Sequence, residues 1–205
     1  MKYSANNGEL NSVTANNDKG VILFSRLNEL NLNECLKNEK TVENSKYTSD
    51  LQKGGKVNYI INEKTQALTF IESNYYRTKI YEEDDIIYKK ETPLMILENS
   101  CLHYGSSLDG RKQAAKRILN MNSKLPVSIK PHGGLFFLPT TSHRNKECVW
   151  FSYSHVDDYW EYEDKLAVIL NNKQVIFVDI SYNQFDLQMK RTSQIIAYFY
   201  LQSLT

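Results

Sequence analysis

Glycines, serines and cations are concentrated in one stretch of the chain, Ser100–Arg117, which reads SCLHYGSSLDGRKQAAKR. Glycine and serine let a backbone approach a ligand closely, and a cluster of cations favours a ligand of negative charge. The chemistry that this stretch favours is therefore the binding of an anion. The residues that would carry it are Gly105, Ser106, Gly110, Arg111, Lys112, Lys116 and Arg117.

This stretch lacks the glycine and Lys-Ser/Thr spacing of a nucleotide phosphate loop and also lacks the dinucleotide fingerprint. The simpler reading is a turn that opens a helix, with Asp109 or Ser107 as the N-cap. Free N–H groups at such a helix start still favour an oxyanion. Arg111 and Lys112 would then lie in the first turn, where cations oppose the helix dipole. We therefore expect a compensating partner, such as a DNA phosphate.

The distribution of charge along the chain is more informative than its total. The 205 residues carry a formal net charge of +1, which by itself indicates no partner. Within residues 101–150, however, eight Lys and Arg residues stand against only Asp109 and Glu147, and acidic residues flank this region at 82–85 and 157–164. Such segregation can build a positive face on a neutral protein. A solvated surface is the plainer reading, and charge alone leaves both open.

Residue types that bind zinc also occur in the chain, at Cys101, His103, His143, Cys148 and His155. Their spacings are irregular, and no CxxC or HxxxH pair is present. Cys101 and Cys148 are equally well read as buried thiols, because cysteine is among the most frequently buried residues. We therefore expect no metal and no cofactor.

Nucleophilic catalysis would need a serine or cysteine beside a histidine. Ser106, Ser107 and Cys148 could each have such a neighbour in space, but no GxSxG elbow surrounds the serines. We expect no catalytic residue and no enzyme activity. A metal-dependent hydrolase remains the enzymatic alternative, and zinc in the purified protein would favour it.

Aromatic residues can stack on the bases of single-stranded nucleic acids, although at strand or helix spacing they more often belong to a core. We assign Trp150 and Phe185 to the core. The candidates for stacking are Tyr153, Tyr159, Trp160, Tyr182, Tyr198 and Tyr200. No helix-turn-helix, zinc-finger or basic-zipper pattern is present, so a DNA-binding chain of this sequence would use loops or arms in the minor groove.

The first 56 residues differ in amino-acid composition from the rest of the chain. They are rich in Asn and polar, so we expect a largely disordered extension and linker, with one amphipathic helix at 21–40. Three cysteines without a disulfide spacing favour a reducing compartment, and no charged leader with an apolar core begins the chain. The longest apolar runs are too short to cross a bilayer. We expect a cytoplasmic protein.

From Val57 onwards the pattern predicts strands. Two short strands are expected around a turn at 62–65, and a second hairpin around Glu82–Asp85. The later runs expected as strands are VSIK, LFFLP, CVWFSYS, KLAVIL and QVIFVDIS, separated by 131–134, 140–146, 157–164 and 171–173.

Three helices are expected in the same region. A short one begins near Thr92, and a basic one runs from Gly110 to Met121, stopped by the segment 124–126. In the basic helix the apolar residues form a stripe beside the cations. The last helix runs from about Phe185 to Leu201.

Five blocks of this sequence resemble the competence transcription factors of the ComK type. They are Ser100–Lys112 (SCLHYGSSLDGRK), Ser123–Val127 (SKLPV), Leu135–Thr140 (LFFLPT), Cys148–Val156 (CVWFSYSHV) and Ile180–Thr192 (ISYNQFDLQMKRT). The resemblance covers about residues 57–200 and is strongest over 95–192. Each block alone is weakly specific, but the order and spacing of all five make chance an unsatisfactory explanation.

The resemblance implies a bacterial transcription activator for DNA-uptake genes. Such proteins bind A/T-rich boxes through the minor groove, as dimers that pair across two boxes. The positions of this chain that match the family pattern are Gly105, Ser106, Gly110, Arg111, Lys112, Ser123, Lys124, Pro126, Tyr182 and Arg191. That particular residues contact DNA is an inference from charge.

Together these observations predict an α+β fold: a strand-rich single domain at 57–205 with a central basic helix and a C-terminal helix, plus a flexible extension at 1–56. The partners expected are A/T-rich double-stranded DNA, a second copy of the chain and RNA polymerase, at the nucleoid, with no membrane. The alternative is a regulator that binds other proteins instead of DNA. The DNA-binding residues predicted are Gly105, Ser106, Gly110, Arg111, Lys112, Lys116, Arg117, Lys124 and Arg191.

Overall fold

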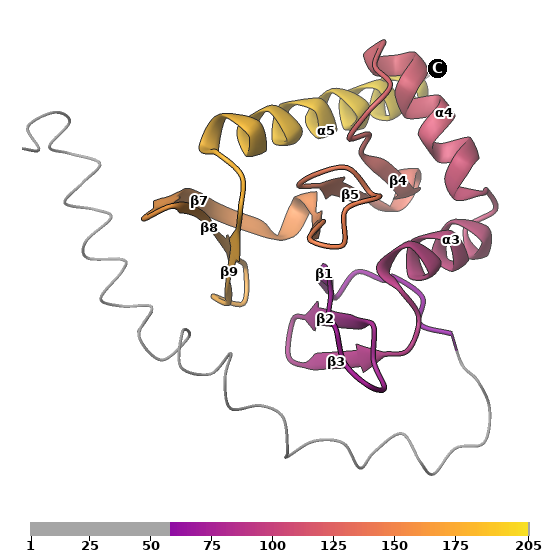
Figure 1. Cartoon of the computed structure of the whole chain (residues 1–205). Coiled ribbons are helices and arrows are strands. Elements are labelled where there is room, and N and C mark those ends of the chain that lie inside the picture. The colour runs from indigo at the N-terminus through magenta and orange to yellow at the C-terminus, as the bar shows by residue number, and fades with distance from the viewer. Residues whose placement is uncertain (1–57, 205) are drawn as a thin grey trace, which may run out of the picture. The chain divides into compact units, whose positions relative to one another are not determined.

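Nine strands and three α-helices form the part of the chain that this computed structural model describes, residues 58–204 (Figure 1). The strands are β1 (Thr65–Phe70), β2 (Thr78–Glu82), β3 (Ile86–Lys89), β4 (Val127–Lys130), β5 (Leu135–Pro139), β6 (Trp150–Ser152), β7 (Val156–Tyr162), β8 (Lys165–Leu170) and β9 (Val175–Val178). The helices are α3 (Pro93–His103), α4 (Leu108–Leu119) and α5 (Tyr182–Gln202), with 3-10 turns η1 (Pro131–Gly133) and η2 (Tyr153–His155). The α+β fold is confirmed. The helix expected at 21–40 lies outside the described residues.

The strands form two antiparallel sheets. The larger sheet has the order β3-β2-β1-β6-β5-β4, and the smaller has the order β7-β8-β9.

The prediction that 157–164 separates two strands was wrong, because most of this segment is β7. Its acidic residues hid the strand pattern, and an edge strand tolerates charged side chains on the face that meets water. The hairpin expected around 82–85 is confirmed as β2 and β3.

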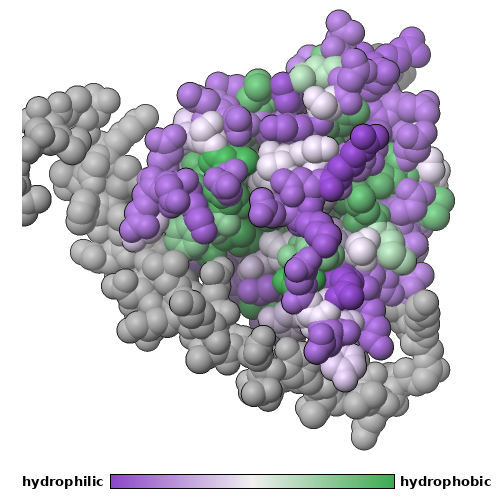
Figure 2. Space-filling model, in the orientation of Figure 1, coloured by the Kyte–Doolittle hydropathy of each residue, from purple (hydrophilic) through white to green (hydrophobic). Residues whose placement is uncertain are grey.

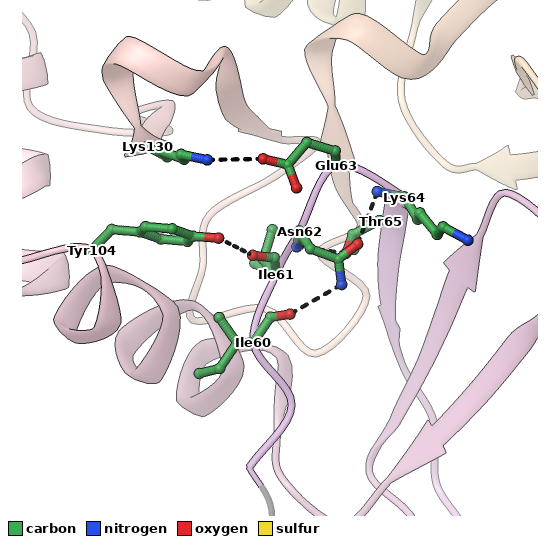
Figure 3. Close-up of polar contacts among 8 residues, drawn as sticks. All are labelled: Ile60, Ile61, Asn62, Glu63, Lys64, Thr65, Tyr104 and Lys130. Atoms are coloured by element: carbon green, nitrogen blue, oxygen red, sulfur yellow. Dashed lines mark hydrogen bonds and ion pairs between the residues drawn. The ribbon is translucent and has the colours of Figure 1, made fainter.

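The first predicted hairpin was wrong in its first strand only. The turn at 62–65 and the second strand, β1, are present, but the residues before the turn contact the C-terminal part of α3 instead of pairing with a strand. The Ile61 N–H donates to Ser100 Oγ at 2.9 Å. Figure 3 shows the second contact, in which Tyr104 Oη donates to the Ile61 carbonyl at 3.1 Å. Lys130 forms an ion pair with Glu63 at 2.9 Å beside them. These two hydrogen bonds satisfy the N–H and the carbonyl of Ile61, which pairs with none of the described strands.

One face of the larger sheet packs against α3. Alternation along the strands sends every second residue to this face, as with Leu68 of β1 and Phe137 of β5. They meet Ile96, Leu97 and Cys101 of the helix in one buried cluster. Thr92 begins α3, since its Oγ1 accepts a hydrogen bond from the Met95 N–H, and Pro93 occupies the first turn.

The opposite face of the sheet carries two further clusters. Phe151 of β6 packs with Phe185 of α5 and with residues of the smaller sheet such as Val168. Phe136 of β5 packs with Ala115 of α4, alongside Ile195 of α5, which is also buried there. Helix α4 therefore contacts both α3 and α5 (Figure 1). This packing fixes the orientation of the cationic face of α4.

Helix boundaries differ from the expected ones at the N-terminal ends. Helix α4 begins at Leu108 instead of Gly110, and it ends at Leu119, followed by the C-cap Asn120 in a left-handed conformation with φ 51°. The expected stop at 124–126 lies beyond this cap. Helix α5 begins at Tyr182, because Ser181 caps it through the Gln184 N–H.

Candidate functional site

The start of α4 is capped by side chains of the chain itself. Ser107 Oγ accepts a hydrogen bond from the Gly110 N–H at 3.0 Å, which confirms one of the two N-caps expected. Glu98 of α3 accepts from the Leu108 N–H at 3.1 Å. Two N–H groups that could have bound an oxyanion therefore already have acceptors. This helix start is a structural joint between α3 and α4.

The earlier helix start also weakens the argument that the cations of α4 oppose the helix dipole. Asp109 lies in the first turn, and Lys116 and Arg117 lie in the last turn. Acidic residues near the N-terminus and basic residues near the C-terminus both agree with the helix dipole. Arg111 and Lys112 are the fourth and fifth residues of the helix, so the earlier start leaves Arg111 at the end of the first turn and moves Lys112 out of it. The helix dipole therefore gives less reason than expected for a partner that compensates these cations.

The predicted loop residues have identifiable structural roles. Gly105 adopts φ +79°, a conformation that favours glycine. A Cβ on Gly110 would lie 3.2 Å from both Ser106 Oγ and Ser107 Oγ, so this position has little room for a side chain. Arg111 is half-buried and donates from Nη2 to the Tyr104 carbonyl at 3.2 Å. These contacts shape the loop between α3 and α4.

A cationic groove lies next to this loop. It has a volume of about 480 Å³ and lies between α4, the segment after it and the loop between β5 and β6. We define the cationic groove by its lining residues, which are Asp109, Lys112, Gln113, Lys116, Asn122, Ser123, Lys124, Leu125, Pro139, Ser142, His143, Arg144 and Trp150. In Figure 2 the surface over α4 is mostly hydrophilic, in contrast to apolar areas over α3 and the smaller sheet.

Four cations of the groove come from three separate segments: Lys112 and Lys116 from α4, Lys124 from the segment after it, and Arg144 from the β5–β6 loop. None of the four forms an ion pair with a carboxylate of residues 58–204. Cations elsewhere in this part of the chain do pair, and the pairs are Lys64–Asp84, Lys130–Glu63, Lys146–Glu72, Lys173–Asp157 and Lys190–Asp186. The four cations therefore outnumber the one carboxylate of the groove lining, that of Asp109, which interacts with Lys112 electrostatically without forming an ion pair.

The ionisable groups of the groove change one another's pKa through electrostatic interactions. Partial burial lowers the pKa of His143, and the positive charges of Lys112 and Arg144 lower it further. Burial also lowers the pKa of Lys112, while Asp109 and Glu98 partly oppose this effect. A lowered pKa means that the protonated form of each group is disfavoured in this groove, and a bound anion would favour that form again.

Gln188 of α5 lies behind the groove and is 1% exposed. Its Nε2 donates to the carbonyls of Lys124 and Pro139, each at 2.8 Å. Arg191 donates from Nη1 to Gln188 Oε1, also at 2.8 Å. Both carbonyls belong to residues that line the groove.

The structure thus brings together only part of the predicted set. Of the nine predicted residues, Lys112, Lys116 and Lys124 line the groove. The others do not line it, namely Gly105, Ser106, Gly110, Arg111, Arg117 and Arg191. The sequence prediction omitted Arg144 and His143. The excess of cations over 101–150 was a signal for Arg144, but its proximity to α4 arises only on folding.

The cysteines and histidines considered for zinc do not form a ligand cluster among residues 58–204, where no group of three candidate ligands occurs. Cys101 is fully buried and Cys148 is 4% exposed, which agrees with their reading as buried thiols. Burial raises the pKa of Cys101 to about 11 and also raises the pKa of Cys148.

The aromatic residues considered in the sequence divide into buried core residues and exposed residues on α5. Trp150 and Phe185 are buried, which confirms their assignment. Among the tyrosines considered for base stacking, Tyr182, Tyr198 and Tyr200 are exposed on α5, but none of them lines the cationic groove.

None of the helices in the described part of the chain combines the length and apolar character needed to cross a bilayer.

Comparison with known proteins agrees with the resemblance noted in the sequence. The family model described as ComK protein matches residues 56–203. The competence transcription factor of Bacillus subtilis (strain 168) is 34% identical over 117 residues, which are 57% of this chain and 61% of that relative. The match thus spans less than two thirds of the relative's length. No solved structure matches the chain. Because the family model covers well over half of its residues, the chain belongs to the ComK family.

Proposed function

We propose that this chain is a DNA-binding transcription activator of competence genes, which serve DNA uptake. It binds A/T-rich boxes of double-stranded DNA through the minor groove, as a dimer or higher oligomer. It acts in the cytoplasm at the nucleoid and contacts RNA polymerase there. The name of its Bacillus subtilis relative supports the regulatory role, and we propose no enzyme activity.

The observation that carries the proposal is the cationic groove. Lys112, Lys116, Lys124 and Arg144 line it without an ion pair to any described carboxylate. Cations that contact DNA phosphates displace condensed counterions, so affinity falls steeply with salt. The groove also contains donors for phosphate oxygens, such as Asn122 and Ser142.

The test of phosphate binding is the slope of log affinity against log salt for an A/T-rich duplex. Each of Lys112→Ala, Lys116→Ala and Lys124→Ala is expected to weaken binding and to reduce the slope by about one. Lys173→Ala is the matched control, because Lys173 pairs with Asp157 at 2.7 Å and does not line the groove. An equal slope for the wild type and all three groove variants would reject the groove as the interface.

Minor-groove recognition would use an exposed arginine. Arg144 lies exposed on the β5–β6 loop, whereas Arg111 is half-buried and bonded to Tyr104. Arginine is favoured in the narrow minor groove of A/T-rich DNA. We expect a minor-groove ligand to compete with the protein, and modification of the major groove to leave binding intact. Arg144→Ala should reduce the preference for A/T-rich over G/C-rich duplexes. The opposite competition result would reject minor-groove docking.

Self-association would use the apolar face of α5. Leu187, Tyr198 and Leu201 are 46%, 45% and 61% exposed, and their spacing places them on one face of the helix. Exposed apolar patches of this kind commonly mark protein contacts. Sedimentation should show a smaller species for Leu201→Glu than for the wild type. Tyr75→Ser, which alters an exposed residue elsewhere, is the control.

A further inference from the structure

We infer that Gln188, oriented by Arg191, is a positioning residue that holds the two walls of the cationic groove at the spacing needed for DNA binding. The inference rests on the proposed function. It assigns Arg191 a role behind the groove, instead of the direct DNA contact expected from the sequence.

The first argument is the pair of hydrogen bonds that Gln188 donates. Nε2 has two protons, and the two carbonyls at 2.8 Å, those of Lys124 and Pro139, use both of them. Because Gln188 is only 1% exposed, water has little access to donate to these carbonyls in its place. Loss of the side-chain amide would therefore leave two carbonyls of the groove wall without this partner.

The second argument is the orientation of the amide. Arg191 carries only donors, so the atom of Gln188 that faces its Nη1 must be the oxygen. Nε2 must then face the two carbonyls. Arg191 thus selects one of the two amide orientations, and the other orientation would place an oxygen against two carbonyl oxygens.

The third argument is where the two carbonyls lie. Lys124 is a groove cation whose backbone adopts φ 50°, an uncommon conformation for a residue other than glycine. Pro139 ends β5, and the loop that bears Arg144 follows it. Gln188 therefore links two segments of the groove wall. One segment carries Lys124, and the other is the end of β5, which leads into the loop that carries Arg144.

The experiment is a double-mutant cycle on the full chain, with an A/T-rich duplex and a salt titration. Gln188→Met keeps the size of the side chain and removes its hydrogen bonds. We expect it to weaken binding about 10-fold and to lower the salt slope by about one, as Lys124→Ala does. In the Lys124→Ala background, Gln188→Met should add much less, because its effect passes largely through Lys124.

Arg191 is tested in the same way. If Arg191 acts through Gln188, Arg191→Met should lower the slope in the wild type but not in the Gln188→Met background. Arg191→Lys, which retains a donor, should restore most of the affinity. If Arg191 contacts a phosphate directly, Arg191→Met should lower the slope equally in both backgrounds, and that result would overturn the inference.

Controls separate positioning from folding. Gln194→Met alters an exposed glutamine of the same helix and should bind as the wild type does. Circular dichroism reports whether each variant is folded. If Gln188→Met does not fold, Arg191→Met is compared in the wild-type and Lys124→Ala backgrounds. It should add little in Lys124→Ala if Arg191 acts through Gln188, whereas a direct phosphate contact would lower the slope equally in both backgrounds. A merely structural role for Gln188 would lower thermal stability and leave the salt slope of the folded protein unchanged. A wild-type chain that binds no duplex would reject the proposed function itself.

Discussion

The Glu98 carboxylate on α3 accepts a hydrogen bond from the Leu108 N–H at the first residue of α4, at 3.1 Å. This bond crosses the turn between the two helices, so it helps to set the direction in which α4 leaves α3. Since Lys112 and Lys116 lie on α4, the same bond helps to place two cations of the groove.

Glu98→Ala should reduce the free energy of unfolding by about 1 kcal/mol, because it removes an acceptor and a negative charge from the start of α4. Chemical denaturation measures the change. Glu161→Ala, at an exposed position on β7, is the control. Equal stability of the two variants would show that Glu98 does not stabilise the joint.

Ser100→Ala should destabilise the fold by about 1 to 3 kcal/mol. Ser100 is fully buried, and its Oγ accepts from the Ile61 N–H at 2.9 Å while donating to the Ile96 carbonyl at 2.7 Å. The variant leaves a buried N–H without an acceptor. Urea titration measures the loss, and Ser203→Ala, near the exposed end of α5, should change little. Unchanged stability in Ser100→Ala would mean that the segment before β1 does not depend on this bond.

DNA affinity should rise as the pH falls from about 7.5 to about 5.5. In the free protein, burial and the charges of Lys112 and Arg144 hold the pKa of His143 below its usual value. Phosphates in the groove would offset those charges and raise the pKa, so the complex would take up a proton. Because binding takes up a proton, the DNA affinity is higher at low pH. The affinity falls as the pH rises toward the pKa of His143 in the complex, by at most about tenfold per pH unit.

His143→Gln is the variant that isolates this effect, since it keeps a polar side chain that does not titrate. It should remove most of the pH dependence at constant salt. Because the lowered pKa of His143 in the folded protein also reduces stability toward acid, circular dichroism must show that both proteins remain folded. The same pH dependence in both proteins would exclude His143 as the group involved.

Cys101 and Cys148 should resist alkylation in the native protein at about pH 8, because burial raises the pKa of both thiols and shields them. The Cys35→Ser variant leaves only these two cysteines. Its labelling by iodoacetamide, followed by mass spectrometry, should be slow in buffer and fast in denaturant. Rapid labelling in buffer would contradict the burial of these side chains.

Local sequence patterns were sufficient to predict features that depend on a single helix, strand or hairpin. Ser107 was expected as an N-cap because serine before a helical pattern accepts a bond from the first turn, and the structure has this bond. The hairpin at 82–85 and the strands at 127–130 and 135–139 follow from alternation and turn residues. Local signals failed at 157–164, where the charge of an edge strand resembled that of a loop.

The sequence by itself determined the α+β class, the basic helix, the burial of Trp150 and the family to which the chain belongs. These follow from residue patterns that act over short distances or survive as matching blocks. Only the tertiary structure decided which cations lie together. Arg144 lies 32 positions after Lys112 in the chain, and the groove that joins them exists because β5, α4 and α5 pack together. It also placed Arg191 against the buried amide of Gln188, a hydrogen bond that leaves no mark in the sequence pattern.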